Sequence, residues 1–289
     1  MTVIPIPGWS AMDALETGTL AVPGATLHYE VRGAGPLLLL IAGGASDAAV
    51  FEPLATVLAA RHRVVSYDPR GNSRSRLHGP PADQRVDVHA DDAHRLLDHL
   101  SADGEPVRVF GGCAGGLVAL ELAIRHPERV RTVVAHEPPV MALLPEEEAH
   151  PAFFDDVHAV FHHEGVASAL DRLSAVFGGR PAPALPEAYD NNPFFLAHVV
   201  RPFTRHVPDL AGLRAVAERI VMAGGEDSRT YTVHRPAVAL AERLGRRPVL
   251  FPGGHAGYAK NPVAFAGRLV EVFTAPPASR DRGAMTCGS

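Results

Sequence analysis

The stretch Val107-Arg108-Val109-Phe110-Gly111-Gly112-Cys113-Ala114-Gly115-Gly116 decides the fold of this chain. Its first half is an apolar run typical of a buried β-strand, and the glycines that follow indicate a tight turn. The next residues, from Gly116 to His126, are apolar on nearly every face, which predicts a helix packed against the middle of a sheet. Cys113 therefore falls at the apex of a strand-turn-helix unit, where a nucleophile would be exposed.

Cys113 has two interpretations at this position. A side chain at so sharp a turn needs small neighbours, and Gly111 and Gly115 meet that need. The N-terminus of the following helix would place partial positive charge near the sulfur and favour a thiolate over a thiol. The alternative is an unreactive buried cysteine, because free cysteine usually behaves as a small core residue.

The composition sets limits on the class of protein. The chain has 289 residues, of which 46% are hydrophobic, enough for one large core in a single α/β domain that carries an insertion. Its formal net charge is −5, and no stripe of Lys or Arg could follow a phosphate backbone, so we expect no nucleic-acid partner. The histidines are scattered and none falls in a metal-binding frame, so we expect no metal and no cofactor.

Targeting signals and crosslinks are not expected either. The first residues lack a basic segment followed by an apolar core, and no apolar run is long enough to span a bilayer. Cys113 and Cys287 are the only cysteines, which makes a structural disulfide an unfavoured interpretation. We therefore expect a cytoplasmic protein with no membrane partner, and the sequence leaves a homodimer open.

Strand-like and helix-like segments alternate along the chain. Helices are predicted near residues 86–100, 236–244 and 262–273, with strands between them. The expected strands are 19–22, 26–31, 36–41, 63–67, 107–112, 130–135, 219–223 and 248–251. This alternation predicts a doubly wound, mostly parallel sheet of eight strands with helices on both faces.

The alternation breaks between residues 141 and 213. We predict four parts: a first part of the α/β core at 1–140, a helical lid at 141–213, a second core part at 214–274, and a disordered tail at 275–289. The lid would lie above the carboxyl edge of the sheet, where ligands bind in such folds. Its many Phe, Leu and Val side chains could line a pocket, although most of them are expected only to pack the lid onto the body.

Several chemically active residues follow predicted strands and so fall at the same sheet edge as Cys113. Gly43 and Gly44 end one strand and could offer a backbone N–H. His255 follows the last strand in a glycine-rich loop. Carboxylates end two further strands, Glu137 in His136-Glu137-Pro138 and Asp227 in Gly224-Gly225-Glu226-Asp227.

These motifs, in this order, resemble the α/β-hydrolase superfamily over almost the whole span from Thr19 to Phe273. Gly111-Gly112-Cys113-Ala114-Gly115 is similar to the G-x-S-x-G nucleophile elbow, with cysteine in place of serine. The segment Asp68-Pro69-Arg70-Gly71-Asn72-Ser73 resembles the D-x-R-G-x-G loop, with Ser73 at the last glycine position. Gly43-Gly44 is similar to the H-G-x segment, with Ala42 in place of the histidine.

The resemblance implies a cofactor-independent hydrolase that works through a covalent acyl-enzyme. Cys113, deprotonated by His255, would attack an ester, lactone or thioester carbonyl of a small apolar substrate, and the N–H groups of Gly44 and Ala114 would form the oxyanion hole. Asp227 occupies the commoner position of the acid that orients the histidine. The setting of Glu137 is similar to the acid segment of zearalenone-type lactonases, which also have a helical cap, so we favour Glu137 slightly.

Other functions remain open at this point. A cysteine nucleophile is similar to that of dienelactone hydrolases, although a serine replaced by cysteine through engineering would give the same sequence. Because a thiolate leaves more readily than an alkoxide, simple alkyl esters should be poor substrates, and acyl transfer or cyclisation gains weight. The scaffold also fits a cyclase or C–C bond enzyme with Cys113 at the periphery, or a silent binding protein with a small ligand beneath the lid.

Overall fold

The computed structural model describes residues 15–101, 103–145, 151–179 and 185–275. Most of the tail predicted at 275–289, and with it Cys287, lies outside the described residues. Within the described part of the chain, no helix is long and apolar enough to cross a membrane.

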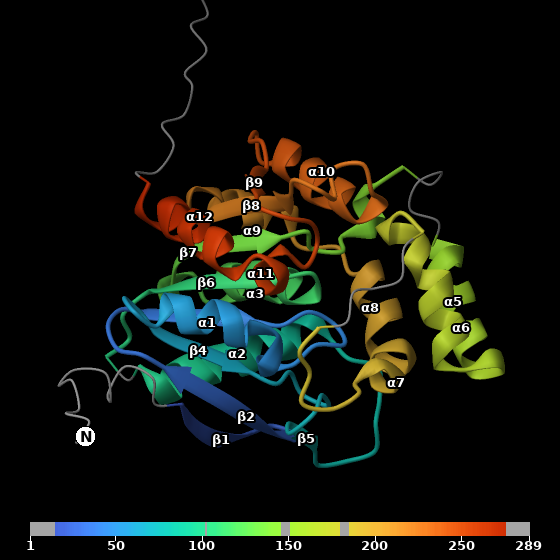
Figure 1. The fold of residues 1–289 in the computed structure, drawn as a ribbon, viewed down its shortest axis with the longest axis horizontal. Coiled ribbons are helices and arrows are strands. Elements are labelled where there is room, and N and C mark those ends of the chain that lie inside the picture. The colour runs from blue at the N-terminus through green and yellow to red at the C-terminus, as the bar shows by residue number, and fades with distance from the viewer. Residues whose placement is uncertain (1–14, 102, 146–150, 180–184, 276–289) are drawn as a thin grey trace, which may run out of the picture.

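A mostly parallel sheet forms the centre of the molecule, as predicted (Figure 1). Eight strands follow the order β1-β2-β4-β3-β6-β7-β8-β9, and the two-residue strand β5, which the sequence did not indicate, pairs with β2. The pairings from β4 through β9 are parallel, whereas β2 pairs antiparallel with β1, β4 and β5. The strands are β1 Glu16–Val22, β2 Ala25–Arg32, β3 Leu37–Ile41, β4 Arg63–Tyr67, β5 Arg76–Leu77, β6 Val107–Gly112, β7 Val130–His136, β8 Ile220–Gly225 and β9 Val249–Phe251.

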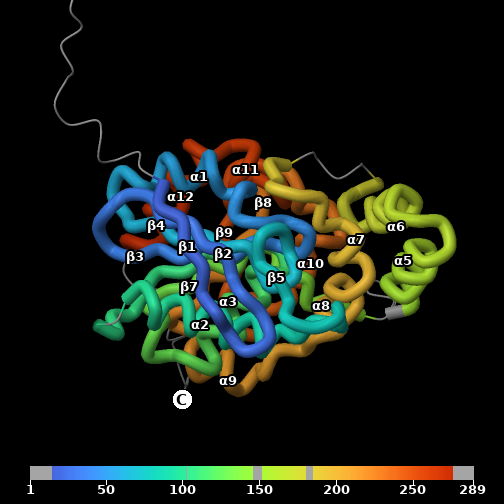
Figure 2. The backbone as a smooth tube through the Cα atoms, turned by 90° about the horizontal axis from the view of Figure 1, so that it is seen from below, coloured from blue at the N-terminus to red at the C-terminus, as the bar shows by residue number. Residues whose placement is uncertain are grey.

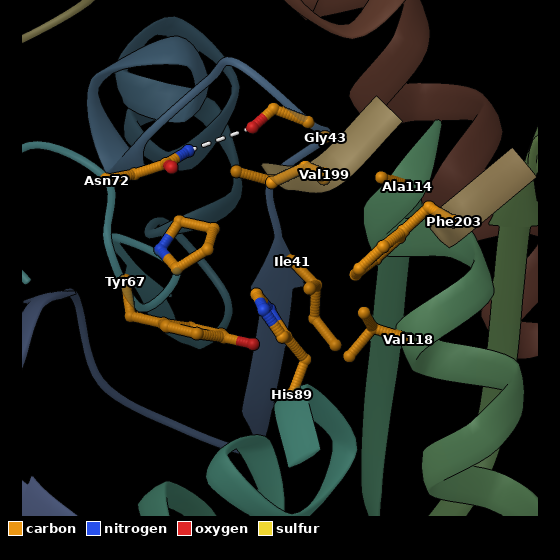
Figure 3. Close-up of a pocket in the computed structure, with 12 residues that line it drawn as sticks. Ile41, Gly43, Tyr67, Asn72, His89, Ala114, Val118, Val199 and Phe203 are labelled. Atoms are coloured by element: carbon orange, nitrogen blue, oxygen red, sulfur yellow. Dashed lines mark hydrogen bonds between the residues drawn. The ribbon is translucent and has the colours of Figure 1, made fainter. Parts of the chain in front are cut away.

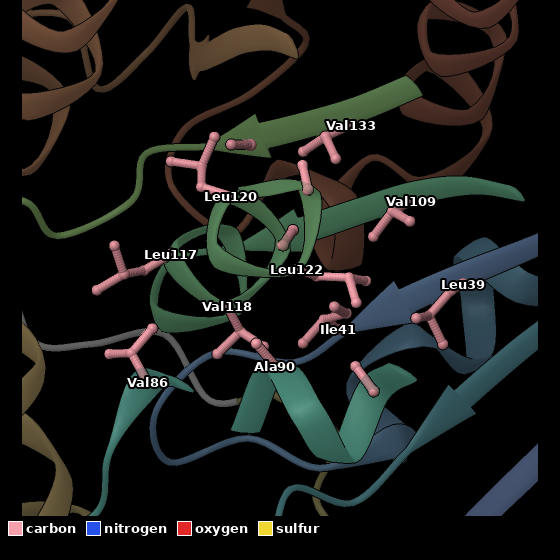
Figure 4. Close-up of a cluster of buried hydrophobic side chains, with 14 of the residues drawn as sticks. Leu39, Ile41, Val86, Ala90, Val109, Leu117, Val118, Leu120, Leu122 and Val133 are labelled. Atoms are coloured by element: carbon pink, nitrogen blue, oxygen red, sulfur yellow. The ribbon is translucent and has the colours of Figure 1, made fainter. Parts of the chain in front are cut away.

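Helices cover both faces of the sheet, because the strands are apolar on both sides. One face packs against α1 (Glu52–Leu58), α11 (Gly257–Lys260) and α12 (Pro262–Thr274). The other face packs against α2 (Val86–Leu100), α3 (Ala114–Arg125) and α10 (Arg235–Arg243). Figure 4 shows the second layer, where Val118 and Leu122 of α3 lie among the side chains of α2 and the central strands. Burial of these apolar side chains on two faces makes the central strands the most rigid place to mount a site.

The chain between β7 and β8 is helical. It contains α5 (Pro151–Glu164), α6 (Val166–Leu173), α7 (Asn192–Phe194), a π-helical turn (Phe195–Val199), α8 (Val200–Arg205) and α9 (Leu210–Ala215). In both views α5 and α6 lie furthest from the sheet, with α7 and α8 between them and the core (Figures 1 and 2). We call this helical segment the cap. It has an apolar cluster of its own, which includes Phe154, Val157 and Leu196. The cap also contains short 3-10 turns at Met141–Leu143, Ser174–Phe177 and Ala217–Arg219, and similar turns outside it span Ala48–Phe51, Pro127–Arg129 and Thr232–His234.

Two glycines allow α3 to approach the neighbouring strands closely. A Cβ on Gly115 would lie 2.1 Å from the carbonyl oxygen of Ile41, and one on Gly111 would lie 2.2 Å from the carbonyl oxygen of Gly115. Both distances are far below van der Waals contact, and the atoms that would be struck belong to the backbone. Glycine at these positions therefore sets how closely the first turn of α3 can lie against β3 and β6.

We predict that Gly115→Ala lowers the free energy of unfolding by about 3 kcal/mol, because neither backbone can yield without moving α3 or β3. Urea unfolding of the variant provides the measurement. The matched control is Gly267→Ala in α12, where a Cβ would meet nothing within 4 Å and helix propensity should stabilise the protein by about 0.5–1 kcal/mol. Equal stability of the Gly115→Ala variant and the parent protein would refute the close approach.

Candidate active site

Cys113 lies at the sharp turn that the sequence predicts. Its backbone has φ 52° and ψ −124°, a strained conformation for a residue with a side chain, and it directly follows β6 and precedes α3. Its N–H donates to the carbonyl of His136 at 2.9 Å, which ties the turn to β7. The thiol is half-buried and free. The turn thus holds the sulfur at the carboxyl edge of the sheet without enclosing it.

Glu137 is presented by the neighbouring strand in the same way. The register of β6 and β7 pairs Gly112 with His136, so Cys113 and Glu137 each stand one residue beyond a paired position. Glu137 also has a positive φ, 47°, and its N–H donates to Ala223 of β8 at 2.9 Å. Its side chain is completely buried. Two strained residues at the ends of adjacent parallel strands therefore place a thiol and a carboxylate at one edge.

The Glu137 carboxylate accepts four hydrogen bonds. Oε1 accepts from the N–H of Gly225 at 2.9 Å, from the hydroxyl of Ser228, and from Nδ1 of His234 at 2.9 Å. Oε2 accepts from Nδ1 of His255 at 2.7 Å. Burial raises the pKa of Glu137, but the hydrogen bonds from His234 and His255, with the charges of His255 and His136, hold it far below its usual value. The carboxylate is therefore ionised, and one of its oxygens is committed to His255.

The glycines at the end of β8 leave space for this arrangement. Strand β8 lies between β7, which carries Glu137, and β9, which precedes His255. A Cβ on Gly224 would lie 2.3 Å from the ring of His234 and 3.3 Å from Oε1 of Glu137, and one on Gly225 would lie 2.5 Å from the backbone of Gly254. Because both positions lack a side chain, the carboxylate and the imidazole can meet across the end of the strand.

His255 connects Glu137 to the thiol. Burial lowers its pKa, but charge interaction and hydrogen bonding with Cys113, together with the Glu137 bond, raise the pKa to about 10. Phe177 of the cap lies against the imidazole, with ring centroids 5.1 Å apart. Nitrogen Nδ1 is occupied by Glu137, so the imidazole is oriented with its other nitrogen available to the sulfur. Sulfur, imidazole and carboxylate therefore form one chain of interactions.

Asp227, the alternative acid, does not take part in this chain. Its side chain is exposed, and within the described residues no hydrogen bond joins its carboxylate to His255. Its N–H donates to Gly253 at 3.0 Å, which holds the loop that leads to His255. Of the two candidate acids, Glu137 is therefore the one that is hydrogen-bonded to His255. The adjacent Ser228 supplies a hydroxyl to Glu137 instead.

Three further residues at the site escaped the sequence analysis. His234 and Ser228 donate to Glu137, and no motif spacing signals either of them. Tyr258 is buried, and burial and the neighbouring Cys113 and Glu137 raise its pKa above the usual value. The phenol therefore stays protonated beside the thiol. Only Tyr258 had a signal in the sequence, since it lies in the same glycine-rich loop as His255.

The loop after β3, residues 42–47, lies directly against Cys113. We call it the β3 loop. A Cβ on Gly43 would lie 2.9 Å from Cβ of Cys113 and 3.8 Å from the N–H nitrogen of Ala114. Within the described residues, neither the N–H of Gly44 nor that of Ala114 has an acceptor. Figure 3 shows this loop, with Gly43 and Ala114 at the upper end of a small cavity and Asn72 hydrogen-bonded to the loop.

The cap contributes two aromatic rings to the site. Phe177 contacts His255, and Phe195 covers Gly44 so closely that a Cβ there would lie 2.3 Å from the ring. Most other apolar side chains of the cap pack in its own cluster, whereas the sequence led us to expect that they would pack the lid onto the body. Within the described residues, no three His, Cys, Asp or Glu side chains are grouped so that they could hold a metal ion.

Comparison with known proteins identifies the class. The model of the α/β hydrolase fold family matches residues 36–180, half of the chain, and the chain belongs to this family. The hydrolase YraK of Bacillus subtilis (strain 168), itself uncharacterized, is 38% identical over 265 residues, which cover 90% of this chain and 96% of YraK. The protein is therefore an enzyme, a hydrolase on the α/β hydrolase scaffold.

More distant matches agree on the fold. A putative carbamate hydrolase, RutD of Azorhizobium caulinodans, is 42% identical over 110 residues, which cover 38% of this chain and 40% of RutD. The crystal structure of the enol-lactonase from Burkholderia xenovorans LB400 has a TM-score of 0.67 at 18% identity, covering 89% of this chain and all of that one (100%). At that identity the likeness shows the shared fold alone.

The Glu137 contact predicts how His255 titrates. We expect a pKa of about 10 in the parent protein and a pKa about one to three units lower in Glu137→Gln, because the neighbouring negative charge is lost. Histidine NMR titration is the measurement, with Asp227→Asn as the control that should leave the pKa unchanged. A drop in Asp227→Asn but not in Glu137→Gln would contradict the assignment.

The same pKa sets a stability window. The folded-state pKa of His255 lies above its unfolded value of 6.5, so its contribution to stability is fully present below pH 6.5 and is lost as the pH rises toward 10. Glu137 acts in the opposite direction, because its folded pKa is lowered and its contribution is lost as the solution becomes acidic.

Proposed function

We propose that the protein cleaves an ester, lactone or thioester of a small apolar substrate through Cys113, His255 and Glu137, by hydrolysis or by acyl transfer. The observation that carries this proposal is the 2.7 Å hydrogen bond from His255 to the buried carboxylate of Glu137, on an imidazole that also interacts with the Cys113 thiol. An acid, a base and a nucleophile in this order are the parts that covalent acyl transfer requires.

Acylation begins from the proton position that the raised pKa of His255 sets. With a pKa of about 10, His255 already holds the proton of the Cys113 thiol, so the thiolate sulfur forms a bond to the carbonyl carbon while the carbonyl π electrons move onto oxygen. Glu137 keeps the imidazole in the tautomer with its proton on Nδ1 and stabilises the imidazolium that forms. When the tetrahedral intermediate collapses, the imidazolium gives its proton to the departing alcohol or thiol.

The negative charge that develops on the carbonyl oxygen needs hydrogen-bond donors of its own. The N–H of Gly44 lies in the β3 loop, which contacts Cys113, and the N–H of Ala114 directly follows Cys113. Neither has an acceptor within the described residues, so both are available to an oxyanion. Loss of one such donor typically raises the barrier by about 3 kcal/mol. The position of the β3 loop should therefore affect the rate of acylation nearly as strongly as the presence of His255 does.

The sulfur narrows the substrate class. In a tetrahedral intermediate with a simple alkyl ester, the thiolate leaves more readily than the alkoxide, so the intermediate returns to substrate. Thioesters, lactones with a stabilised leaving group and activated esters are better substrates, because their leaving groups compete with the thiolate. The rings of Phe177 and Phe195 beside His255 and Gly44 favour an apolar group next to the scissile carbonyl.

Release of the acyl group uses the same residues. Water, deprotonated by His255, attacks the thioester carbonyl, and the sulfur leaves with its electron pair and recovers the proton. An alcohol, an amine or a group within the acyl chain could replace water in this step. Hydrolysis, acyl transfer and cyclisation then differ only in the second nucleophile.

Acylation of Cys113 can be detected directly. We expect p-nitrophenyl acetate and small thioesters to add one acyl group to the intact protein, at Cys113, and to add none to Cys113→Ala. Intact mass spectrometry with peptide mapping provides the measurement, and Cys113→Ser shows whether the scaffold also supports an oxygen nucleophile. If Cys113→Ala retained turnover, a cyclase or C–C bond reaction would be favoured. Tight ligand retention without product would indicate a binding protein.

The orienting acid can be tested by kinetics. With a thioester substrate, Glu137→Gln should lower kcat by about 100-fold or more, because the imidazole loses its orientation and the charge that stabilises imidazolium. Asp227→Asn should change kcat by less than about two-fold, as expected for an exposed side chain. A larger loss in Asp227→Asn than in Glu137→Gln would overturn the roles assigned to the two acids.

A further inference from the structure

Asp47, at the end of the β3 loop, is a buried carboxylate that joins three segments of the chain. Its Oδ2 accepts from the hydroxyl of Ser73 at 2.6 Å, from the N–H of Ala188 at 2.7 Å and from Nδ2 of Asn191 at 3.4 Å. Oδ1 accepts from the N–H of Ala49 at 2.8 Å. The side chain is completely buried, and no cation pairs with it within the described ranges. A buried carboxylate of this kind depends on every one of its donors.

Two of the four donors come from the cap. Ala188 and Asn191 lie just before α7, more than 140 positions along the chain from Asp47. Asn191 is itself buried; its carbonyl oxygen accepts from the N–H of Ser73 at 2.7 Å, and its Nδ2 donates to the hydroxyl of Ser73 at 3.0 Å. Ser73 stands with φ 46° at the position where the family loop has glycine. Asn191 therefore bridges the β3 loop and a strained serine.

The β3 loop has little internal structure to fix it. Between the end of β3 and the 3-10 turn at Ala48, its internal backbone hydrogen bond is the one from Ser46 N–H to Gly43 O at 2.8 Å. Side chains hold the rest: Asn72 donates to the carbonyls of Gly44 and Ser46, both at 2.9 Å. Figure 3 shows the bond from Asn72 to the β3 loop. Asn72 precedes Ser73, whose N–H donates to Asn191, so the loop that holds Gly44 is held in turn by Asn191.

The cap also presses on the loop directly. Phe195, four residues after Asn191, covers Gly44, and Phe194 covers Gly71 closely enough that a Cβ there would lie 2.2 Å from its ring. Polar and aromatic contacts from one cap segment, residues 188–195, thus fix both loops that surround the N–H of Gly44.

We propose that Asp47 and Asn191 are positioning residues, which couple the cap segment 188–195 to the β3 loop and thereby hold the N–H of Gly44 where the oxyanion forms. The inference rests on the proposed acyl chemistry at Cys113 and adds a requirement to it. Stabilisation of the oxyanion depends on the cap as well as on the sheet, whereas the thiol, imidazole and Glu137 are all mounted on the sheet. Disturbing Asn191 should therefore affect reactions that develop an oxyanion and spare those that do not.

Two reagents for the same sulfur separate these effects. Acylation of Cys113 by p-nitrophenyl acetate passes through an oxyanion, whereas alkylation by iodoacetamide displaces iodide at a methylene carbon and forms none. In Asn191→Ala we expect acylation to slow about 10-fold, with alkylation within about two-fold of the parent protein. In turnover, kcat should fall while KM stays nearly constant, because the lost interaction acts in the transition state. The matched control is Asn192→Ala, whose carboxamide donates to the exposed Asp190 at 2.8 Å, and both rates should be unchanged.

The outcomes are distinguishable. Unchanged acylation in Asn191→Ala, or an equal fall in acylation and alkylation, overturns the positioning role. If Asn191→Ala does not fold, as judged by circular dichroism and thermal unfolding, Ser73→Ala provides the same comparison, because it removes the hydroxyl that donates to Asp47 and accepts from Asn191. Failure of the parent protein itself to be acylated defeats the proposed function, and the inference with it, before any variant is compared.

Discussion

The candidate site depends on the buried carboxylate of Glu137. Removing an ionised carboxylate from water costs several kcal/mol unless hydrogen bonds replace its hydration, and this one has four donors, three from residues 225–234 and one from His255. Three donors hold one oxygen, so the other can serve His255 alone. Because Oε1 is held by three donors and Oε2 faces His255, the carboxylate fixes the position of the imidazole. In the proposed mechanism, the imidazole in turn determines where the thiol proton goes.

A parallel sheet brings these side chains together without special structure elsewhere in the fold. Adjacent strands end at one edge, and the pairing of Gly112 with His136 brings the next residues, Cys113 and Glu137, side by side. Both adopt left-handed backbone conformations that non-glycine residues avoid, and the apolar layers on either face hold them there. Among the described residues, two of the three non-glycine positions with a positive φ are thus those whose side chains project from the edge, and the third is Ser73.

The cap supports the β3 loop, the part of the site that the sheet does not hold. Glu137, His255 and Cys113 need only strand ends and glycines, but the β3 loop has few bonds of its own and relies on Asn72, Ser73 and the cap. Division of the site between a rigid sheet and a separate helical segment allows the residues around the substrate to vary without disturbing the chain from Cys113 through His255 to Glu137.

The sequence predicts the parts of this protein that depend on local pattern. Apolar runs and glycine turns indicated the central strands, and α2 spans the residues 86–100 predicted for it. Helix α3 begins at Ala114, two residues earlier than its apolar pattern suggests, because Gly115 fits the close approach to β3 and Gly116 the approach to β6. Parts that depend on contacts distant in sequence were beyond reach.

The choice of acid shows this limit most clearly. Glu137 and Asp227 both follow strands, and the sequence favoured Glu137 only slightly. The two acids differ in which side chain turns inward. Glu137 has a positive φ and its side chain is buried, whereas the side chain of Asp227 is exposed. His234 and Ser228, which hold Glu137, lie more than 90 positions away and belong to no motif. Of the many aromatic residues in the cap, Phe177 and Phe195 reach the site for reasons of packing alone.

The most direct test of the account is a crystal structure of the protein acylated by an activated ester. We predict a thioester on Sγ of Cys113, with its carbonyl oxygen about 2.7–3.1 Å from the N–H nitrogens of both Gly44 and Ala114, and with His255 still hydrogen-bonded to Glu137. An acyl group on another residue, or a thioester whose oxygen points away from both amides, would contradict it.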